Sequence, residues 1–374
     1  MKLSRIGIRR VLSLLAAAGL LVAAGPGPGP ATATSGTSRD LAIGFVLDRG
    51  RIEKIDLPGN GDGTTLFRIT NGGRIVGKAP NPDGVGYYGF VGDRSGRFHR
   101  IDYPGATTTY AQGINERGWI VGGASPGPTV LDPGATGYLL VGGKFTRIAY
   151  PAAVYTQAVG INNRGQVVGE YRDQAGVSHG FRWQHGRFVS FDGPRGTDAA
   201  ISDINDRGDM VGAYAVPADN ELGVRYRGFL LREGKYTTFA APGRPFATFP
   251  FDINNRGQVS GFSYRDTDLT ELHGFLLRNG ADGPVRQIDV PRAPNTQVVG
   301  LDDRGRLIGV YQNPNVAPGA QRTLASRPTV EALQAWVAKA SRASISRDIV
   351  SSPAPWASAS TMSRVADGMP AATW

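Results

Sequence analysis

The chain contains no cysteine among its 374 residues. This absence excludes disulfides, thiolate zinc sites and a cysteine nucleophile. An exported protein of this length can do without disulfides, because its core is large enough to stabilise it. Histidine is scarce too, at 4 residues, and the H-E-x-x-H, G-x-S-x-G, Walker and dinucleotide glycine motifs are absent from the sequence. We therefore predict no catalytic residue, no cofactor and no metal site.

Long hydrophobic runs are also missing, apart from one near the N-terminus. The run Val11 to Ala24 follows four basic residues and is followed by small residues. It is shorter than the roughly 20 residues that cross a bilayer, so it predicts a secretory signal peptide over residues 1–33. An uncleaved membrane anchor stays an alternative, although GPGPGP follows the run in place of a basic stop-transfer patch. The pair Arg9 and Arg10 leaves twin-arginine export open beside Sec export.

The charge balance is moderately basic, with a formal net charge of +10. Residues 1–33 contribute four of these charges, so the processed chain carries about +6. The sequence has no basic block with interleaved aromatic residues, which is the pattern expected of a nucleic-acid surface. We expect a protein secreted to the outside or to the bacterial cell envelope, with no nucleic-acid partner and no stable membrane insertion after processing.

One unit is repeated six times along the chain. The strings GINERGWIVGG, GINNRGQVVGEY, DINDRGDMVGAY and DINNRGQVSGF are close copies, and RITNGGRIVGK and GLDDRGRLIGVY are looser ones. Their turn glycines set a repeat of 43 to 49 residues: Gly73, Gly118, Gly165, Gly208, Gly257 and Gly305. A Gly-aromatic string such as GFLL and a proline-closed run keep step with each turn.

These repeats predict an all-β protein. Gly or Pro interrupts each unit every 8 to 12 residues, which leaves room for four short strands and none for helices. Such a small sheet cannot bury both faces alone, so neighbouring sheets must stack on it. We predict a six-bladed β-propeller of four-stranded blades over residues 43–312. A clasp that pairs the C-terminal strand 306–312 with the N-terminal strand 43–48 would close the ring, the alternative being six independent blades.

The remaining segments are assigned from their composition. Residues 34–42 form a linker, residues 313–344 a linker with a short C-terminal amphipathic helix, and residues 345–374, rich in Ser, Ala and Pro, a flexible tail.

The NNRG string predicts a hairpin turn in which Asn and Gly adopt positive φ. A calcium loop was the alternative, but an arginine occupies a would-be ligand position in five of the six copies, and a guanidinium cannot bind calcium. We expect these arginines to bond a carboxylate or a backbone carbonyl of the same or the adjacent blade.

At SHGFRW, LHGFLL and DINNRGQVSG the chain resembles the bacterial extracellular repeat family of the HAF type. The resemblance covers roughly residues 43–312, with Gly where the family name has Ala and the histidine kept in two copies. It implies secretion and a propeller-like repeat, and it offers no catalytic residue.

Function on a propeller usually depends on loops that differ from the repeated unit. We therefore look for candidate functional residues in the irregular loops. Three long loops, 124–136, 215–227 and 263–273, follow the same type of strand and should emerge on one face. From them we predict a binding surface made of Asp219, Asn220, Glu221, Arg225, Tyr226, Tyr264, Arg265 and Asp266.

Other polar repeats are interpreted as structural. Asp56, Asp102, Asp192 and Asp289 precede the repeat prolines and read as turn caps, too far apart for two-carboxylate chemistry. His179 and His273 occupy the same position of the repeated unit in two copies, at the start of a strand.

The sequence therefore favours a secreted binding propeller without enzymatic activity, which recognises a cell-wall glycan or an extracellular protein. The alternative is an extracellular lyase or hydrolase acting at the mouth of the channel.

Overall fold

A computed structural model describes residues 42–55, 64–220, 223–243, 245–267, 271–278, 280 and 283–314. The chain divides into two units, Met1–Arg327 and Pro328–Trp374, and every described residue belongs to the first. The predicted signal peptide, C-terminal helix and tail lie outside the described residues. Within the described part no helix combines the length and apolarity that a membrane crossing needs.

The fold is all-β, with twenty-four strands and one 3-10 turn at Pro194–Gly196 among the described residues. The strands form five antiparallel sheets, four of them with four strands. These four sheets are β2 (Arg51–Ile55), β1 (Ala42–Asp48), β24 (Leu307–Gln312), β23 (Thr296–Leu301); β3 (Thr65–Ile69), β4 (Arg74–Pro80), β5 (Tyr87–Asp93), β6 (Phe98–Ile101); β7 (Thr108–Ile114), β8 (Ile120–Ser125), β9 (Thr136–Val141), β10 (Lys144–Ile148); and β11 (Tyr155–Ile161), β12 (Val167–Arg172), β13 (Ser178–Gln184), β14 (Arg187–Phe191).

The fifth sheet has eight strands and consists of two successive four-stranded meanders. Its strands are β15 (Ala199–Ile204), β16 (Met210–Pro217), β17 (Val224–Arg232), β18 (Lys235–Phe239), β19 (Ala247–Ile253), β20 (Val259–Tyr264), β21 (Leu272–Leu277) and β22 (Val285–Ile288). A single parallel bridge between Tyr226 and Ala247 joins the two meanders. Because of this bridge, the prediction of six separate four-stranded sheets is not confirmed in that form.

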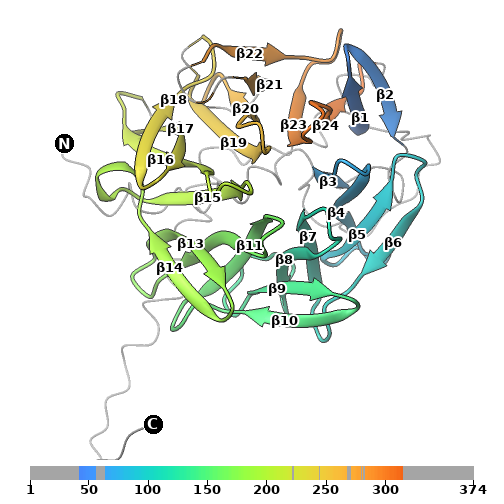
Figure 1. The fold of residues 1–374 in the computed structure, drawn as a ribbon, viewed down its shortest axis with the longest axis vertical. Helices are drawn as coiled ribbons and strands as arrows, with labels where there is room; N and C mark the ends of the chain where they lie inside the picture. The colour runs from blue at the N-terminus through green and yellow to red at the C-terminus, as the bar shows by residue number, and fades with distance from the viewer. Residues whose placement is uncertain are drawn as a thin grey trace, which may run out of the picture. The chain divides into compact units, whose positions relative to one another are not determined.

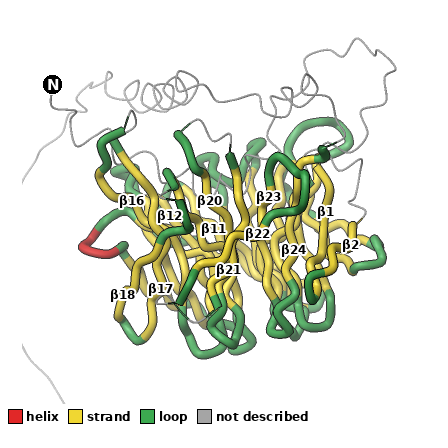
Figure 2. Tube along the Cα trace, turned by 90° about the horizontal axis from the view of Figure 1, so that it is seen from above, coloured by secondary structure: helices red, strands yellow, loops and turns green. Residues whose placement is uncertain are grey.

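The sheets are arranged radially around a centre (Figure 1). The first strand of each meander lies innermost, and these inner strands contact one another in a closed cycle: β3, β7, β11, β15, β19, β23 and back to β3. The strands run between two faces of the ring (Figure 2). One face carries the NNRG-type turns and is called the turn face. The other carries the connections from each second strand to the third and is called the loop face.

The predicted clasp between the two ends of the repeat region is confirmed. β1 pairs antiparallel with β24, from Ala42 opposite Gln312 to Leu47 opposite Leu307. The C-terminal side supplies β23 and β24 and the N-terminal side β1 and β2, so each end contributes two strands to one sheet. The innermost strand of each meander is the one that precedes its NNRG-type turn, as β23 is in this sheet.

The second glycine of every repeat has a packing reason. Each lies directly opposite the aromatic residue of the third strand, as Gly169 does opposite Phe181. A Cβ on Gly169 would lie 1.9 Å from the carbonyl oxygen of Gln157 and 2.9 Å from the Phe181 ring. The same pairing joins Gly309 to Phe45 across the clasp. The aromatic side chain of the third strand therefore packs over a glycine that has no side chain of its own. These repeated aromatic residues contribute to the core between sheets.

Candidate functional site

The first asparagine of each NNRG string caps its own turn. Asn162 Oδ1 accepts the backbone N–H groups of Arg164 at 3.1 Å and Gln166 at 3.0 Å, while Gly165 N–H donates to the Asn162 carbonyl. Gly165 has φ 74°, and the residues with positive φ in these turns are the glycines. The expectation that Asn also adopts positive φ here was wrong, because the asparagine is held by its side-chain bonds in an ordinary turn.

The same asparagine links its repeat to the next one. Its Nδ2 donates to the backbone carbonyl at the equivalent position: Asn115 to Asn162 at 3.0 Å, Asn162 to Asn205 at 2.9 Å, Asn205 to Asn254 at 3.2 Å and Asn254 to Asp302 at 2.9 Å. Asp302 has no amide to donate. Instead it holds Arg306 Nε at 2.6 Å, and Arg306 donates onward to the carbonyl of Asn71 at 2.7 Å.

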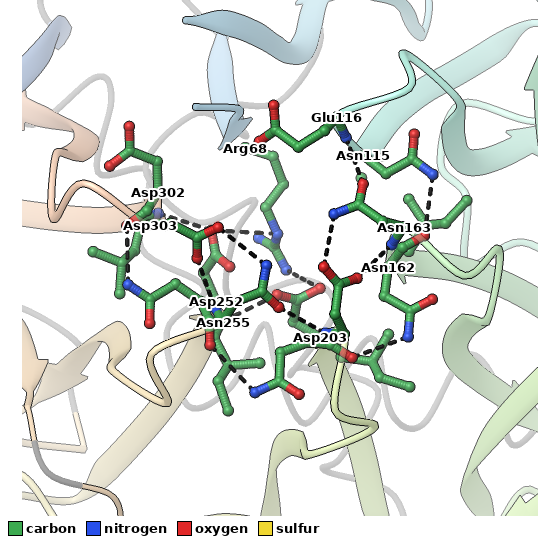
Figure 3. A pocket seen from close by; sticks show the side chains of 18 of the residues that line it. Arg68, Asn115, Glu116, Asn162, Asn163, Asp203, Asp252, Asn255, Asp302 and Asp303 are labelled. Carbon is green, nitrogen blue, oxygen red and sulfur yellow. Dashed lines mark hydrogen bonds and ion pairs between the residues drawn. The ribbon is translucent and has the colours of Figure 1, made fainter. Parts of the chain in front are cut away.

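The second position of the string forms a complete cycle of hydrogen bonds, part of which is drawn in Figure 3. Each backbone N–H donates to the side-chain oxygen of the next repeat at 2.7 to 2.9 Å. The cycle runs Asn71, Glu116, Asn163, Asp206, Asn255, Asp303 and back to Asn71. The repeated string therefore fastens neighbouring sheets together at the turn face, which is the role its Asn and Asp side chains perform.

Beneath this cycle a buried ionic cluster lies in the channel. Arg68 on β3 is 3.6 Å from Asp203 on β15 and 3.6 Å from Asp252 on β19, and all three side chains are at most 7% exposed. The guanidinium also donates to backbone carbonyls of β15, β19 and β23. The carboxylates accept backbone N–H groups in turn, Asp203 from Ile253 at 3.1 Å and Asp252 from Leu301 at 2.8 Å.

The electrostatics of this cluster favour a neutral arrangement. Burial raises the pKa of Asp252 well above its usual value, and the neighbouring Asp203 charge adds to the shift, while Arg68 opposes it. With Asp252 protonated, the positive charge of Arg68 is balanced by Asp203 alone. The cavity at this mouth is only about 70 Å³. It has room for a few water molecules but not for a sugar ring.

The sequence prediction missed this cluster, although a signal was present. The three residues occupy one template position, five before the turn glycine, whose six occupants are Arg68, Gly113, Gly160, Asp203, Asp252 and Gly300. A β-bulge precedes this position in every inner strand. One cation and two carboxylates among three glycines at equal radius would have indicated a charge cluster on the axis.

The predicted loop surface is only partly available. Tyr226 and Tyr264 are 2% and 3% exposed and pack with Phe246, Phe249 and Phe262 in the core. Their assignment to an exposed surface was wrong, because each lies on a strand, β17 or β20, with its ring against the neighbouring inner strand. Glu221 lies outside the described residues.

The polar members of the predicted surface are placed on two loops of the loop face. Asp219 and Arg265 are exposed, and Arg265 forms an ion pair with Glu271 at 3.0 Å. Asn220, Arg225 and Asp266 are half-buried. Asn220 Nδ2 donates to the Val224 carbonyl at 2.7 Å and shapes its own loop. The structure does not bring these residues into a described pocket.

The template histidines pair with the aspartates that precede the repeat prolines. His179 lies 2.7 Å from Asp192 and 3.4 Å from Asp173, and His273 lies 3.1 Å from Asp289. These pairs link the third and fourth strands of one meander. Asp102 pairs with Arg100 at 2.6 Å, and Asp56 lies outside the described residues. Among the described residues no group of three or more acidic or histidine side chains could hold a metal ion.

A second cavity, of about 810 Å³, opens beside the central mouth. We call it the arginine groove. It spans three successive repeats and is lined by NNRG turns and by the hairpins between third and fourth strands. Its charged residues are Arg164, Arg182, Arg207, Asp209, Arg232, Glu233, Arg256 and Arg278.

The groove arginines differ in whether a carboxylate pairs with them. Arg207 and Arg232 share the carboxylate of Asp209 at 2.8 and 3.1 Å. Burial opposes ionisation of Asp209, but hydrogen bonds from Arg232, Asn205 and Arg207 hold its pKa below the usual value. The other four, Arg164, Arg182, Arg256 and Arg278, have no carboxylate within 4.0 Å in the described parts of the chain.

The predicted role of the NNRG arginines is confirmed for Arg207, which bonds Asp209 and the backbone carbonyl of Asn255 in the next repeat. Arg117 instead lies over the ring of Trp119, 5.3 Å from its centre. Arg164 and Arg256 line the groove and form no such side-chain bond with the described residues.

No family model and no curated protein matches the chain. TolB from Acinetobacter baumannii is similar at TM-score 0.46 and 11% identity, over 72% of this chain and 63% of that one. The β-propeller domain of the Trilobed protease from Pyrococcus furiosus is similar at TM-score 0.41 and 13% identity, over 73% and 91%. The Aleuria aurantia lectin in complex with Fucα1-6GlcNAc is similar at TM-score 0.39 and 11% identity, over 68% and 98%.

The radial arrangement of four-stranded meanders defines the fold of the described residues as propeller-like. The chain spans less than two thirds of the TolB chain. At these identities the likeness concerns the fold, and function has to be argued from the residues of this chain.

Proposed function

We propose that the chain is a secreted, six-bladed propeller of the HAF repeat type that binds an extracellular glycan or protein partner and catalyses no reaction. The six-membered cycle of hydrogen bonds and the closed cycle of inner strands support the blade count. The basic N-terminus with its short apolar run supports export to the bacterial cell envelope.

One contrast carries the proposal for binding. At the central mouth the charged groups are already bonded to one another, and the cavity is about 70 Å³. In the arginine groove the cavity is about 810 Å³, and four guanidinium groups have no carboxylate partner among the described residues. Ligand pockets typically measure about 300–1,000 Å³ and present a few polar groups that fix the ligand. The groove has this size and these groups, on a scaffold held rigid by the repeat fasteners.

A binding screen tests this proposal. The purified protein is incubated with immobilised cell-wall polysaccharides and with proteins of a culture supernatant, and the released sugars are assayed in parallel. We expect retention of at least one polymer or protein without release of products. The loop face is the second candidate surface, with Asp219, Asn220, Arg225, Arg265 and Asp266. Shortening the β16–β17 loop separates its contribution from that of the groove.

A lyase or hydrolase at the channel mouth is the second candidate, because two carboxyl groups from different meanders converge on Arg68. Paired carboxyl groups with separated pKa values are the usual arrangement for acid–base catalysis. Product release that disappears in the variant D203N/D252N would establish the enzyme and overturn the binding proposal. Secretion is tested separately by mass spectrometry of the exported chain, which should begin near Thr34.

A further inference from the structure

The arginine groove has a charge that narrows the class of its ligand. Among the described residues its lining carries six arginines against two carboxylates, Asp209 and Glu233. Asp209 is 5% exposed and already bonded to Arg207 and Arg232, so it presents little negative charge to a ligand. An uncharged ligand would leave four guanidinium groups to be solvated by water alone inside the groove. An anionic ligand would pair with them.

The groove extends across three repeats, so its positive groups form a series. Arg164, Arg207 and Arg256 occupy the same position in three consecutive turns, and Arg232 and Arg278 share one position at two of the adjoining hairpins. Arg182 lies two residues earlier in its repeat, on β13, where the other two repeats have Leu230 and Leu276. A single small anion can meet only one or two of these groups. A polymer with a regularly spaced anionic group can meet several, because both partners repeat.

The chemistry of guanidinium indicates which anions fit. Its planar fork of N–H donors matches carboxylate, sulfate and phosphate oxygens in paired hydrogen bonds. A single-stranded nucleic acid would in addition need aromatic faces on which bases stack. Among the described residues of the lining the one aromatic residue is Phe191, which packs against the hydrophobic cluster of Val168, Ala199 and Phe229.

We propose that the arginine groove binds an acidic polysaccharide, a polymer whose sugars carry carboxylate or sulfate groups at regular intervals. This inference rests on the proposed binding function and names its ligand class and its site. Arg164, Arg182, Arg256 and Arg278 supply the free guanidinium groups. Arg207 and Arg232, which are paired with Asp209, also line the groove.

A matched pair of variants tests the proposal. The groove variant R164Q/R256Q/R278Q removes three charges from the lining. The control variant R51Q/R147Q/R304Q removes the same net charge from exposed sites outside it. Arg304 sits at the NNRG turn position that Arg164 and Arg256 occupy, so the control also matches the turn type. Binding to polygalacturonate, dextran sulfate, neutral dextran and polyglutamate is measured by calorimetry at two salt concentrations.

We expect both acidic polysaccharides or one of them to bind, with the affinity lowered by salt. The groove variant should lose at least tenfold in affinity and the control variant less than threefold. Polygalacturonate and dextran sulfate distinguish carboxylate from sulfate as the preferred group. Polyglutamate should bind more weakly than the acidic polysaccharides.

Three results would overturn the inference while leaving the proposed function intact: equal losses in both variants, equal binding of neutral dextran, or tightest binding of polyglutamate. Equal losses would indicate attraction by net charge, and the other two a neutral or a peptide ligand. If the broader screen of glycans and extracellular proteins also retains nothing, the proposed binding function itself fails. Circular dichroism of each variant confirms that the fold is unchanged.

Discussion

The central mouth and the arginine groove lie on the same turn face, yet they use the same residue types in opposite ways. At the mouth, backbone N–H groups donate to the Asn, Asp and Glu side chains of the next repeat in a closed cycle, and Arg68 lies 3.6 Å from two carboxylates. In the groove, the adjacent arginine of the same string has no carboxylate partner among the described residues at Arg164 and Arg256. A repeated string can therefore contain positions that fasten neighbouring repeats and a position that is available to bind a ligand.

The largest expected effect concerns the ionic cluster in the channel. The substitution Arg68→Met should lower the free energy of unfolding by about 3–5 kcal/mol, because it leaves two carboxyl groups buried without their cation. The triple variant R68M/D203N/D252N should recover most of this loss, since no buried charge remains. Urea unfolding followed by fluorescence measures both. A loss under about 1 kcal/mol for R68M would mean that the cluster is more hydrated than its burial indicates.

The next effect is a dependence of stability on pH that originates in the interior. Burial raises the pKa of Glu170 from its ordinary 4.5 to about 7 and lowers the pKa of Lys78 from 10.5 to about 7. Between pH 4.5 and 7 the folded state keeps the Glu170 proton that the unfolded state loses, so stability falls as pH rises. Between pH 7 and 10.5 the unfolded state keeps the Lys78 proton that the folded state lacks, so stability rises with pH.

These two groups together predict a minimum of stability near pH 7. Glu170→Gln should remove its share of the falling limb, about 3 kcal/mol at most, and leave the share of Asp252, whose pKa burial also raises. Lys78→Met should remove the rising limb. Both are read from unfolding free energies between pH 5 and 10. Groove substitutions should leave the profile unchanged. A wild-type profile with a maximum near pH 7 would show that these groups do not govern it.

A smaller effect is expected at the fasteners. Asp206 accepts the backbone N–H of Asn163 at 2.7 Å and its amide at 2.8 Å. Asp206→Ala removes both acceptors and should cost about 1–2 kcal/mol of unfolding free energy. Asp206→Asn keeps the oxygen that receives the backbone N–H and should cost less than half as much. Equal costs for the two variants would show that the backbone bond contributes nothing.

The smallest effect on stability belongs to the groove itself. Arg164→Gln and Arg256→Gln should each change the unfolding free energy by less than about 0.5 kcal/mol, because both side chains are exposed and without an ion-pair partner among the described residues. The mouth and the groove should therefore differ most in how much a lost arginine lowers the free energy of unfolding. A loss above about 1 kcal/mol in either variant would assign these arginines to the scaffold.

The sequence predicted the all-β repeat and the clasp because both depend on local patterns. Gly at the turn, Gly opposite the aromatic residue and the strand spacing each leave a mark in a single unit, as Gly169 and Phe181 do. The ionic cluster was missed because Arg68, Asp203 and Asp252 are far apart in the chain and meet only when inner strands converge on one axis. The exposure of Tyr226 and Tyr264 was misjudged because a loop assignment ignores the strand register that turns a ring inward.

The most direct test of the account is hydrogen exchange with and without an acidic oligosaccharide that the protein retains. We expect added protection at the turns 163–166, 206–209 and 255–257 and at the hairpin 232–234, with no change in the loops 126–135 and 265–267. Protection confined to those loops, or to the channel-lining strands β3, β15 and β19, would contradict the division between a fastened centre and an open arginine groove.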